Sequence, residues 1–311
     1  MNALLLSFAN ELGFERVYLL KPVPYPHLAA RRAAVTLHKN AARLVADPTA
    51  AYPWANAVAL LVLPYRPYAK GLGVSGYYPA SNRAYHAANR LLDALAAAGV
   101  RAERAELPIR ETLLMHGLGI ACQNGLTAVP PFGTRAVFQS LVLDLPDAAY
   151  TPDGPYGGPD GARQCAGCGL CAKACPAGAI TERGLGFTRC IRAYMEGGDM
   201  PEAVMDAMTS LLGCELCQYA CPLNREVPEE PTLPDAFGLS RLLSGDTAGA
   251  LALIGKNMKS GGRLEQHAAI MAGKQGRADL LPLLDRLAED ARAPVAHAAA
   301  YARKWLRKSA E

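Results

Sequence analysis

The sequence predicts an α+β fold in three parts: an α/β segment over residues 1–150, a cysteine-rich segment over 163–227 and a helical segment over 235–311. Three observations predict it. The first segment alternates helical and strand-like patterns, the second contains eight of the nine cysteines, and the third is helical throughout. A stretch rich in proline and glycine, Tyr150–Ala162, and a stretch with three prolines, Glu226–Pro234, mark the two boundaries.

The first segment predicts helices and strands in alternation. Helices are expected where apolar residues recur every three to four positions before a glycine, and strands where a short apolar run is enclosed by turn residues. In chain order, the expected elements are a helix over Asn2–Leu12 closed by Gly13, a buried strand over Ala57–Tyr65, a helix over Arg83–Ala98 ended by Gly99, and a strand over Thr134–Leu145.

The third segment predicts a set of paired helices. Alanine-rich helical patterns cover Leu264–Gly273, Ala278–Glu289 and Pro294–Leu306. Paired helices of this length are typical of a short HEAT-like unit.

The cysteines follow a spacing that indicates two [4Fe-4S] clusters. A C-x2-C-x2-C-x3-C run closed by Pro176 is followed by a lone cysteine and by a C-x2-C-x3-C run closed by Pro222. In the two-cluster bacterial pattern, the fourth cysteine of the first run binds the other cluster. We therefore predict a two-cluster ferredoxin-like domain, with Cys165, Cys168, Cys171 and Cys221 on one cluster and Cys175, Cys190, Cys214 and Cys217 on the second.

Two other interpretations of these cysteines fit the spacing less well. Zinc ribbons use separated C-x2-C pairs and not a run of four cysteines closed by proline. A disulfide framework belongs to secreted chains, and no signal-like segment is evident in this sequence. In the cluster interpretation, Gly167 and Gly169 let backbone amides approach the sulfur atoms, and such donors stabilise the more negative, reduced cluster.

Composition places the chain among cytoplasmic proteins without a membrane segment. It is 51% hydrophobic and 19% charged, and its apolar runs are far shorter than the roughly 18 residues that cross a bilayer. From Asp246 to Glu311 there are eleven Lys and Arg against seven Asp and Glu. This excess predicts either a basic face that meets a phosphate backbone, such as that of tRNA, or a solvated helical surface.

The order of these parts resembles the epoxyqueuosine reductases, which are cobalamin-dependent enzymes related to the reductive dehalogenases. The resemblance extends beyond the cysteines to several stretches of sequence. These are Tyr78–Leu92, Gly117-Leu118-Gly119, Asn124-Gly125, Phe132-Gly133, Cys190-Ile191, Gly213–Gln218, Gly255-Lys256-Asn257 and His267-Ala268-Ala269.

The resemblance implies a nitroreductase-like N-terminal domain that holds cobalamin against the cluster domain. Electrons from an external donor such as ferredoxin or flavodoxin would pass through the clusters to cobalt, and the reduced cobalt would remove the epoxide oxygen of a tRNA-borne nucleoside. The candidate cofactor-binding residues are Tyr85, His86, Gly117, Gly119, Asn124, Gly125, Cys190 and Ile191.

The chain departs from the family where the proton donor is expected. The family has an aspartate in an Asp-Thr-Gly-Pro motif, whereas this chain reads Ala105-Glu106-Leu107-Pro108. Glu106 is the candidate acid, because a desolvated carboxyl can be raised to a working pKa, and the alternative is an ordinary solvated residue. His116 is a second candidate proton source, and Cys122, the cysteine outside the cluster set, is expected to be a buried thiol.

Two classes of function follow from this pattern. The first is an iron-sulfur reductase in which the clusters feed cobalamin. The second is a ferredoxin-like electron carrier or redox-responsive protein without cobalamin. The sequence favours the reductase, because a simple carrier needs neither a large N-terminal domain nor a helical tail. The departures around Glu106 favour a divergent member of the family and leave the substrate open.

Overall fold

The computed structural model describes residues 2–26, 28, 43–71, 73–156, 165–195, 197 and 200–308. They form two compact units, each of which is described by itself below. The first comprises Met1–Tyr65, Ala80–Gly169 and Pro222–Val227, and the second comprises Arg66–Pro79, Leu170–Cys221 and Pro228–Glu311. Residues 157–164, which include the second half of the predicted stretch Tyr150–Ala162, lie outside the described residues.

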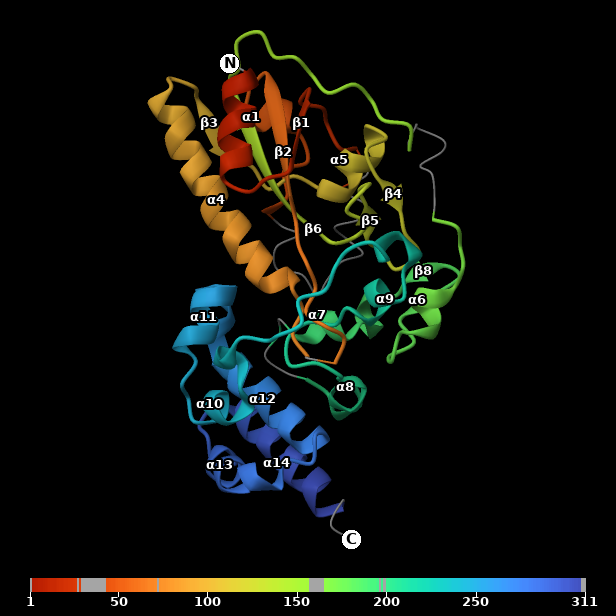
Figure 1. The fold of residues 1–311 in the computed structure, drawn as a ribbon, viewed down its shortest axis with the longest axis vertical. Coiled ribbons are helices and arrows are strands. Elements are labelled where there is room, and N and C mark those ends of the chain that lie inside the picture. Colours follow the sequence, from red (N-terminus) through yellow and green to blue (C-terminus); the bar gives the residue numbers. More distant parts are fainter. Residues whose placement is uncertain are drawn as a thin grey trace. The chain divides into compact units, whose positions relative to one another are not determined.

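The first unit is built on a mixed set of helices and short strands (Figure 1). Its elements are α1 (Asn2–Glu11), β1 (Arg16–Leu20), α3 (Pro48–Ala51), β2 (Ala57–Pro64), most of α4 (Tyr77–Ala97), β3 (Ala102–Arg104), α5 (Ile109–Met115), β4 (Ile120–Ala121), β5 (Thr127–Ala128) and β6 (Ala136–Leu143).

The main sheet of this unit is antiparallel, in the order β1-β2-β6-β3. β2 occupies a central position and is buried over nearly its whole length, which explains why it reads as a continuous apolar run. Its register with β6 pairs Ala57 with Leu143 and Pro64 with Ala136. The α+β class predicted from the sequence is thereby confirmed.

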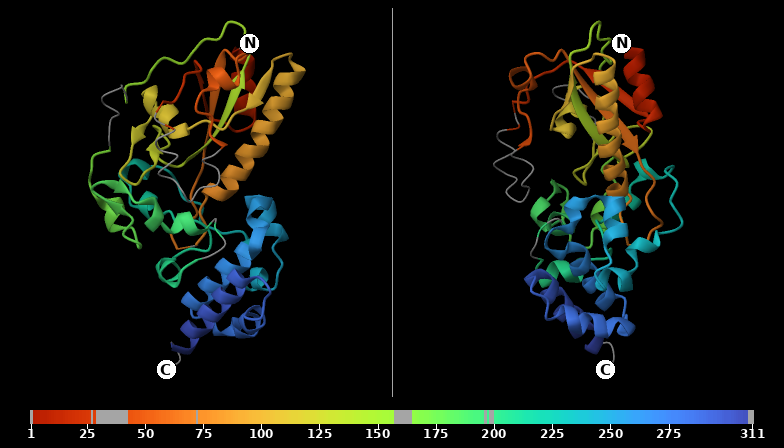
Figure 2. Two further views of the ribbon diagram at one scale, coloured as in Figure 1. Left: turned by 180° about the vertical axis from the view of Figure 1, so that it is seen from behind. Right: turned by 90° about the vertical axis from the view of Figure 1, so that its left-hand side faces the viewer.

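Helices cover both faces of this sheet. Val58, Leu60 and Val62 of β2 point to one face, where they share a core with Leu113 of α5. Arg104 of β3 points to the other face and donates to the Tyr85 carbonyl of α4 at 3.1 Å, so α4 lies on that side. Figure 2 shows the same sheet from two further directions.

The second unit contains most of the cysteine-rich segment. Its elements are α6 (Leu170–Lys173), β7 (Ile180–Thr181), β8 (Gly184–Leu185), η2 (Phe187–Arg189), α7 (Ile191–Met195), α8 (Glu202–Ala207) and α9 (Leu216–Tyr219). The elements are short, and this segment contributes few buried apolar residues before Ile191. The turn η3 (Pro222–Asn224) follows α9 and belongs to the first unit.

The tail of the second unit is helical, as predicted. It contains η4 (Asp235–Phe237), α10 (Leu239–Leu243), α11 (Ala248–Ile254), η5 (Lys256–Gly262), α12 (Arg263–Lys274), η6 (Ala278–Leu280), α13 (Leu281–Leu287) and α14 (Ala293–Lys308).

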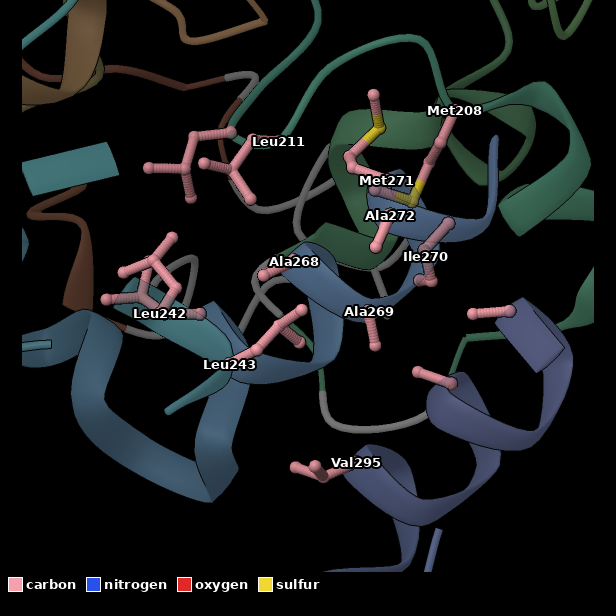
Figure 3. Close-up of a cluster of buried hydrophobic side chains, with 14 of the residues drawn as sticks. Met208, Leu211, Leu242, Leu243, Ala268, Ala269, Ile270, Met271, Ala272 and Val295 are labelled. Carbon is pink, nitrogen blue, oxygen red and sulfur yellow. The ribbon is translucent and has the colours of Figure 1, made fainter. Parts of the chain in front are cut away.

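One hydrophobic core joins this tail to the cysteine-rich segment. Ile270 of α12 is fully buried in it, together with Met208 and Leu211 from the segment that precedes Cys214 (Figure 3). Gly273 allows α12 to approach α14 closely, since a Cβ at that position would lie 2.7 Å from the Ala302 Cα. The helical tail and the cysteine-rich segment therefore bury their apolar surfaces against each other.

The start of α4 is the element boundary that differs most from the sequence prediction. The helix expected from Arg83 begins earlier, at Tyr77, because Pro79 lies in its first turn, where proline costs no hydrogen bond. Cys171 lies in the single turn of α6. No helix among the described residues has both the length and the apolar character needed to span a bilayer.

Candidate functional site

Four cysteines assigned to the second cluster lie within electrostatic range of one another in the second unit. Burial, followed by the charges of Cys214, Cys190, Cys171 and Cys175, raises the pKa of the Cys217 thiol to about 12. Burial also raises the pKa of Cys214 and that of Cys190, and the charge of Cys175 contributes to both. Thiolates this close are tolerated when a cation neutralises them, so the donor set fits an iron-sulfur cluster.

Backbone amides are directed at these sulfur atoms. Ala179 N–H donates to Cys175 Sγ at 3.3 Å, across a turn that contains Gly178 at a φ of 55°. Cys190 directly precedes α7, and the nearby backbone N–H groups of Arg192 and Ala193 lower the pKa of its thiol, against the larger effect of burial. Each of these amides places positive hydrogen where a bound cluster carries its negative charge.

The cysteines assigned to the other cluster are distributed along both units. Cys168 is exposed, between Gly167 and Gly169, which both adopt positive φ values. Cys171 and Cys221 are half-buried residues of the second unit. No three Cys, His, Asp or Glu side chains in the described ranges converge tightly enough to hold a single metal ion. A cubane needs no such convergence, because each of its four thiolates binds a different iron atom.

Cys165 is attached to a β-hairpin of the first unit. Its backbone N–H donates to the Ala121 carbonyl at 3.0 Å, and its sulfur accepts a hydrogen bond from the Gln123 N–H at 3.4 Å. Its side chain packs against a small apolar cluster of Ile120, Cys122 and Ala128. Cys122 is buried, in accordance with the expectation for the cysteine outside the cluster set.

This hairpin contains several of the predicted cofactor-binding residues. Strands β4 and β5 pair Ile120 with Ala128 and are joined by a tight turn that includes Asn124 and Gly125. Gly119 allows close packing, because a Cβ there would lie 2.5 Å from Thr127 Cγ2 and 3.3 Å from Leu113 Cβ.

Asn124 carries an unused hydrogen-bond donor. The residue is 3% exposed, and its Oδ1 accepts from the Leu126 N–H at 3.2 Å. Its Nδ2, also buried, has no hydrogen-bond partner among the described residues. A buried donor without a partner is costly and uncommon, so this amide fits a residue that completes its hydrogen bonds with a bound ligand.

Tyr85 and His86 lie on the exposed part of α4, with their rings 5.5 Å apart in an edge-to-face arrangement. The Arg104 guanidinium stacks 4.5 Å from the Tyr85 ring centroid. It also donates to Asn89 Oδ1 at 2.7 Å and to Gln139. Arg104 therefore fixes the position of Tyr85. No local sequence motif marks Arg104, because the pairing of strands brings it to Tyr85.

The two candidate proton donors have different surroundings. Glu106 is exposed, between the buried residues Ala105 and Leu107, and its backbone carbonyl accepts from the Val45 N–H at 2.8 Å. Glu106 thus has the surroundings of an ordinary solvated residue, which was the alternative to a desolvated acid. His116 Nδ1 lies 3.0 Å from Asp153 Oδ1, and Asp153 was not predicted because it lies in a proline-rich stretch distant in sequence.

Gly117 and Cys190-Ile191, the remaining candidates, have local structural roles. Gly117 adopts a φ of 62°, and its carbonyl accepts from the Tyr156 N–H at 3.0 Å. Ile191 is buried in the core of the second unit. The structure thus groups Gly119, Asn124 and Gly125 in one hairpin and Tyr85 with His86 on one helix.

A polar cavity lies beside the loop of the second cysteine quartet. It is a small pocket that is open to solvent and is lined in part by Lys70, Ser75, Ser210, Gly213, Glu215 and Tyr219. Gly213, at a φ of 67°, approaches Ser75 and Tyr78 so closely that a Cβ would lie 2.8 Å from Ser75 Cβ. The loop before Cys214 is therefore held against the segment that leads into α4.

Comparison with known proteins agrees with the prediction of two [4Fe-4S] clusters. Residues 164–224 match a family described as a 4Fe-4S double cluster binding domain. The epoxyqueuosine reductase of Staphylococcus aureus is 26% identical over 200 residues, which cover 60% of this chain and 50% of that protein. The epoxyqueuosine reductase of Aliivibrio fischeri is 32% identical over 126 residues, which cover 38% of this chain and 32% of that protein. The chain therefore matches half the length, or less, of these curated relatives.

Solved structures extend the likeness to almost the whole chain. An epoxyqueuosine reductase from Bacillus subtilis superposes with a TM-score of 0.74 at 20% identity, covering 98% of this chain and 90% of that one. An epoxyqueuosine reductase solved with an epoxyqueuosine-modified tRNA stem loop gives a TM-score of 0.77 at 19% identity, with the same coverage. The resemblance predicted from the sequence is confirmed: the chain is similar in sequence to epoxyqueuosine reductases over part of its length, and it has their fold.

Proposed function

We propose that this protein is an iron-sulfur reductase that uses two [4Fe-4S] clusters and cobalamin to remove an epoxide oxygen from a queuosine precursor in tRNA. The observation that carries the proposal is a quartet of mutually close, amide-supported thiols, Cys175, Cys190, Cys214 and Cys217, inside a fold shared with the epoxyqueuosine reductases. An electron carrier without cobalamin would need the quartet but not the rest of this fold.

The residues present fit both cofactors. When bound, the clusters would supply one-electron transfer and cobalamin the reducing equivalents at the substrate. Eight thiolates are available for the clusters, with Cys165, Cys168, Cys171 and Cys221 proposed for one of them. For cobalamin, the support is the buried, unpartnered Nδ2 of Asn124 in a hairpin whose glycines bring the backbone close.

Individual side chains have proposed tasks around the corrin. Asn124 would donate its free N–H to a polar group of the ligand, and Tyr85, held by Arg104, would form an immobile aromatic wall. We retain Glu106 as the proposed proton donor, with its exposure as the main argument against it. Closure of the site over substrate would have to remove Glu106 from water before it could act as a general acid.

We propose that the three sequence segments have separate tasks. Residues 1–150 would hold the corrin in a nitroreductase-like arrangement, 163–227 the clusters, and 235–311 would act as a HEAT-like platform. An external carrier such as ferredoxin or flavodoxin would deliver electrons, and the exposure of Cys168 supports an entry point at the cluster it binds.

tRNA is the proposed macromolecular partner, since a relative has been solved with a tRNA stem loop. Much of the positive charge of the tail is already paired: Arg292 bonds Glu265 and Asp290, and Arg303 bonds Asp285. Lys256 and Lys259 of η5 are exposed, and no ion pair to either occurs among the described residues. We propose these two lysines as phosphate contacts.

The test is anaerobic turnover of the reconstituted protein with cobalamin, a low-potential reductant and tRNA that carries epoxyqueuosine. Mass spectrometry of the digested nucleosides would detect queuosine. We expect conversion by the wild-type chain, no conversion by Cys217→Ala, and slower conversion by Glu106→Gln. Absence of queuosine with all cofactors bound would refute epoxyqueuosine as the substrate.

A further inference from the structure

The hairpin of the first unit ends in a turn of recognisable type. The Gly125 N–H donates to the Cys122 carbonyl at 3.0 Å, and the Cys122 N–H donates to the Leu126 carbonyl at 3.0 Å. Gly125 adopts a φ of 81°. This is the three-residue hairpin loop in which a type I turn is followed by a left-handed glycine, and it places Gln123 at the second position of the turn.

At that second position, the Gln123 N–H points out of the hairpin and donates to Cys165 Sγ at 3.4 Å. The contact is held from the other side, because the Cys165 N–H donates to the Ala121 carbonyl at 3.0 Å. Cys165 is half-buried against the apolar side chains of the same hairpin. Two hydrogen bonds and a packed side chain thus fix the sulfur opposite one particular amide.

The turn is also held from behind by Arg110 of α5. The Arg110 guanidinium donates to the Gly125 carbonyl at 3.2 Å, to the Leu126 carbonyl at 2.9 Å and to Thr127 Oγ1 at 3.3 Å. An amide held this firmly keeps its direction when the charge of the neighbouring sulfur changes, which is what electrostatic tuning requires.

We propose that the Gln123 backbone N–H sets the reduction potential of the cluster that Cys165 binds, so that the turn Cys122–Gly125 is a tuning element for electron entry. Reduction adds one electron to the cluster, and no covalent bond is made or broken. The added negative charge strengthens the N–H to sulfur hydrogen bond, so the bond stabilises the reduced cluster and raises its potential. The proposal depends on cluster binding alone and not on the reductase activity proposed above.

Proline offers a selective way to remove this donor. Gln123→Pro deletes the N–H, and proline is favoured at the second position of a type I turn. The residue before it, Cys122, follows directly from strand β4 and suits the extended conformation that a following proline demands. Gln123→Ala is the matched control, because it removes the side chain and keeps the N–H.

The experiment is an EPR-monitored redox titration of the full-length chain, reconstituted with iron and sulfide and titrated with dithionite in the absence of corrin and tRNA. We expect Gln123→Pro to move one of the two reduction potentials to a more negative value and to leave the other in place. Gln123→Ala should keep both wild-type potentials. If Gln123→Pro retains both clusters and both wild-type potentials, the proposal is overturned.

A second measurement applies if Gln123→Pro fails to fold or loses its cluster. Pulsed EPR on the reduced wild-type protein, labelled with 15N-glutamine, should detect a nitrogen coupling that labelled Gln123→Ala lacks. Identical spectra from the two labelled proteins would overturn the proposal. Because neither corrin nor tRNA is present, failure of the proposed reductase function would not alter either result.

Discussion

At the scale of single residues, the second cysteine quartet predicts how much iron the protein loses when one cysteine is replaced. The pKa of Cys217 is the most strongly raised among the cysteine thiols, because the half-buried side chain loses hydration and has four other cysteines around it. Cys217→Ser should therefore lower the iron content of the reconstituted protein from about eight to about four atoms per chain. Iron and sulfide analysis measures this directly.

Cys122→Ala is the matched control for that experiment. Cys122 is buried in the hairpin and has no assigned cluster role. Its replacement should leave about eight iron atoms per chain. Loss of half the iron in the Cys122 variant, and none in the Cys217 variant, would contradict the assignment of ligands.

His267 predicts a pH dependence of stability in the second unit. It is fully buried in α12, and burial lowers its pKa from the usual 6.5 to about 4. The nearby Leu211 backbone raises the pKa, although neither ring nitrogen has a hydrogen-bond partner among the described residues, and the charge of Arg263 lowers it further. The unfolded chain binds the proton more readily, so stability is complete above about pH 6.5 and falls as the pH drops towards 4, by about 3 kcal/mol at most.

The check is urea unfolding of the anaerobic protein at several pH values between 7.5 and 4.5, alongside His267→Leu. The variant has no group to protonate at this position, so its stability should depend less steeply on pH. Equal slopes for both proteins would show that His267 is not the residue responsible.

At the scale of elements, the hairpin of β4 and β5 depends on one glycine. Gly119→Ala would bring a Cβ within 2.5 Å of Thr127 and 3.3 Å of Leu113, so α5 and β5 would have to separate. We expect a loss of about 1–3 kcal/mol in unfolding free energy. Gly186→Ala is the control, since its Cβ would lie 3.5 Å from the nearest atom, and thermal melts should leave it near wild type.

The elements themselves were predictable where one pattern dominated. The strand at Ala57 and the helix at Asn2 were found because burial on both faces and helical spacing are local properties of the sequence. The start of α4 was missed because the predicted alanine- and leucine-rich pattern begins at Arg83, six residues after the helix does. The hairpin at Ile120 was not predicted, because its strands have two residues each and give no periodic signal.

The candidate site was predictable to a similar extent. Cysteine spacing alone identified the quartet around Cys217, since ligand spacing is fixed by cluster geometry. Arg104 and Asp153 were not found, because each meets its partner only after the chain has folded. The link from Gln123 to Cys165 is likewise a tertiary contact.

At the scale of the whole molecule, the shared core of the second unit predicts that clusters and tail unfold together. Ile270 is fully buried between the helices of the tail and the segment before Cys214. Ile270→Ala should destabilise this unit by about 2–5 kcal/mol. Helical circular dichroism and the visible absorbance of the clusters should then fall at the same lower temperature.

Separate transitions would contradict that expectation. If helicity were lost while cluster absorbance persisted, the tail would be an independent domain, and the division at 227–235 would apply to folding as well as to sequence. The conservative variant Ile270→Val serves as a control, with an expected loss of about 0.5–1.5 kcal/mol.

We propose that the fold shared with the epoxyqueuosine reductases holds cobalamin as well as clusters. The measurement that tests it most directly is gel filtration of the reconstituted chain with cobalamin, followed by absorption and EPR spectra of the protein peak. We predict cob(II)alamin in the peak at about one equivalent per chain, with less retained by Asn124→Ala. A peak that contains both clusters and no corrin would contradict the claim and favour an electron carrier.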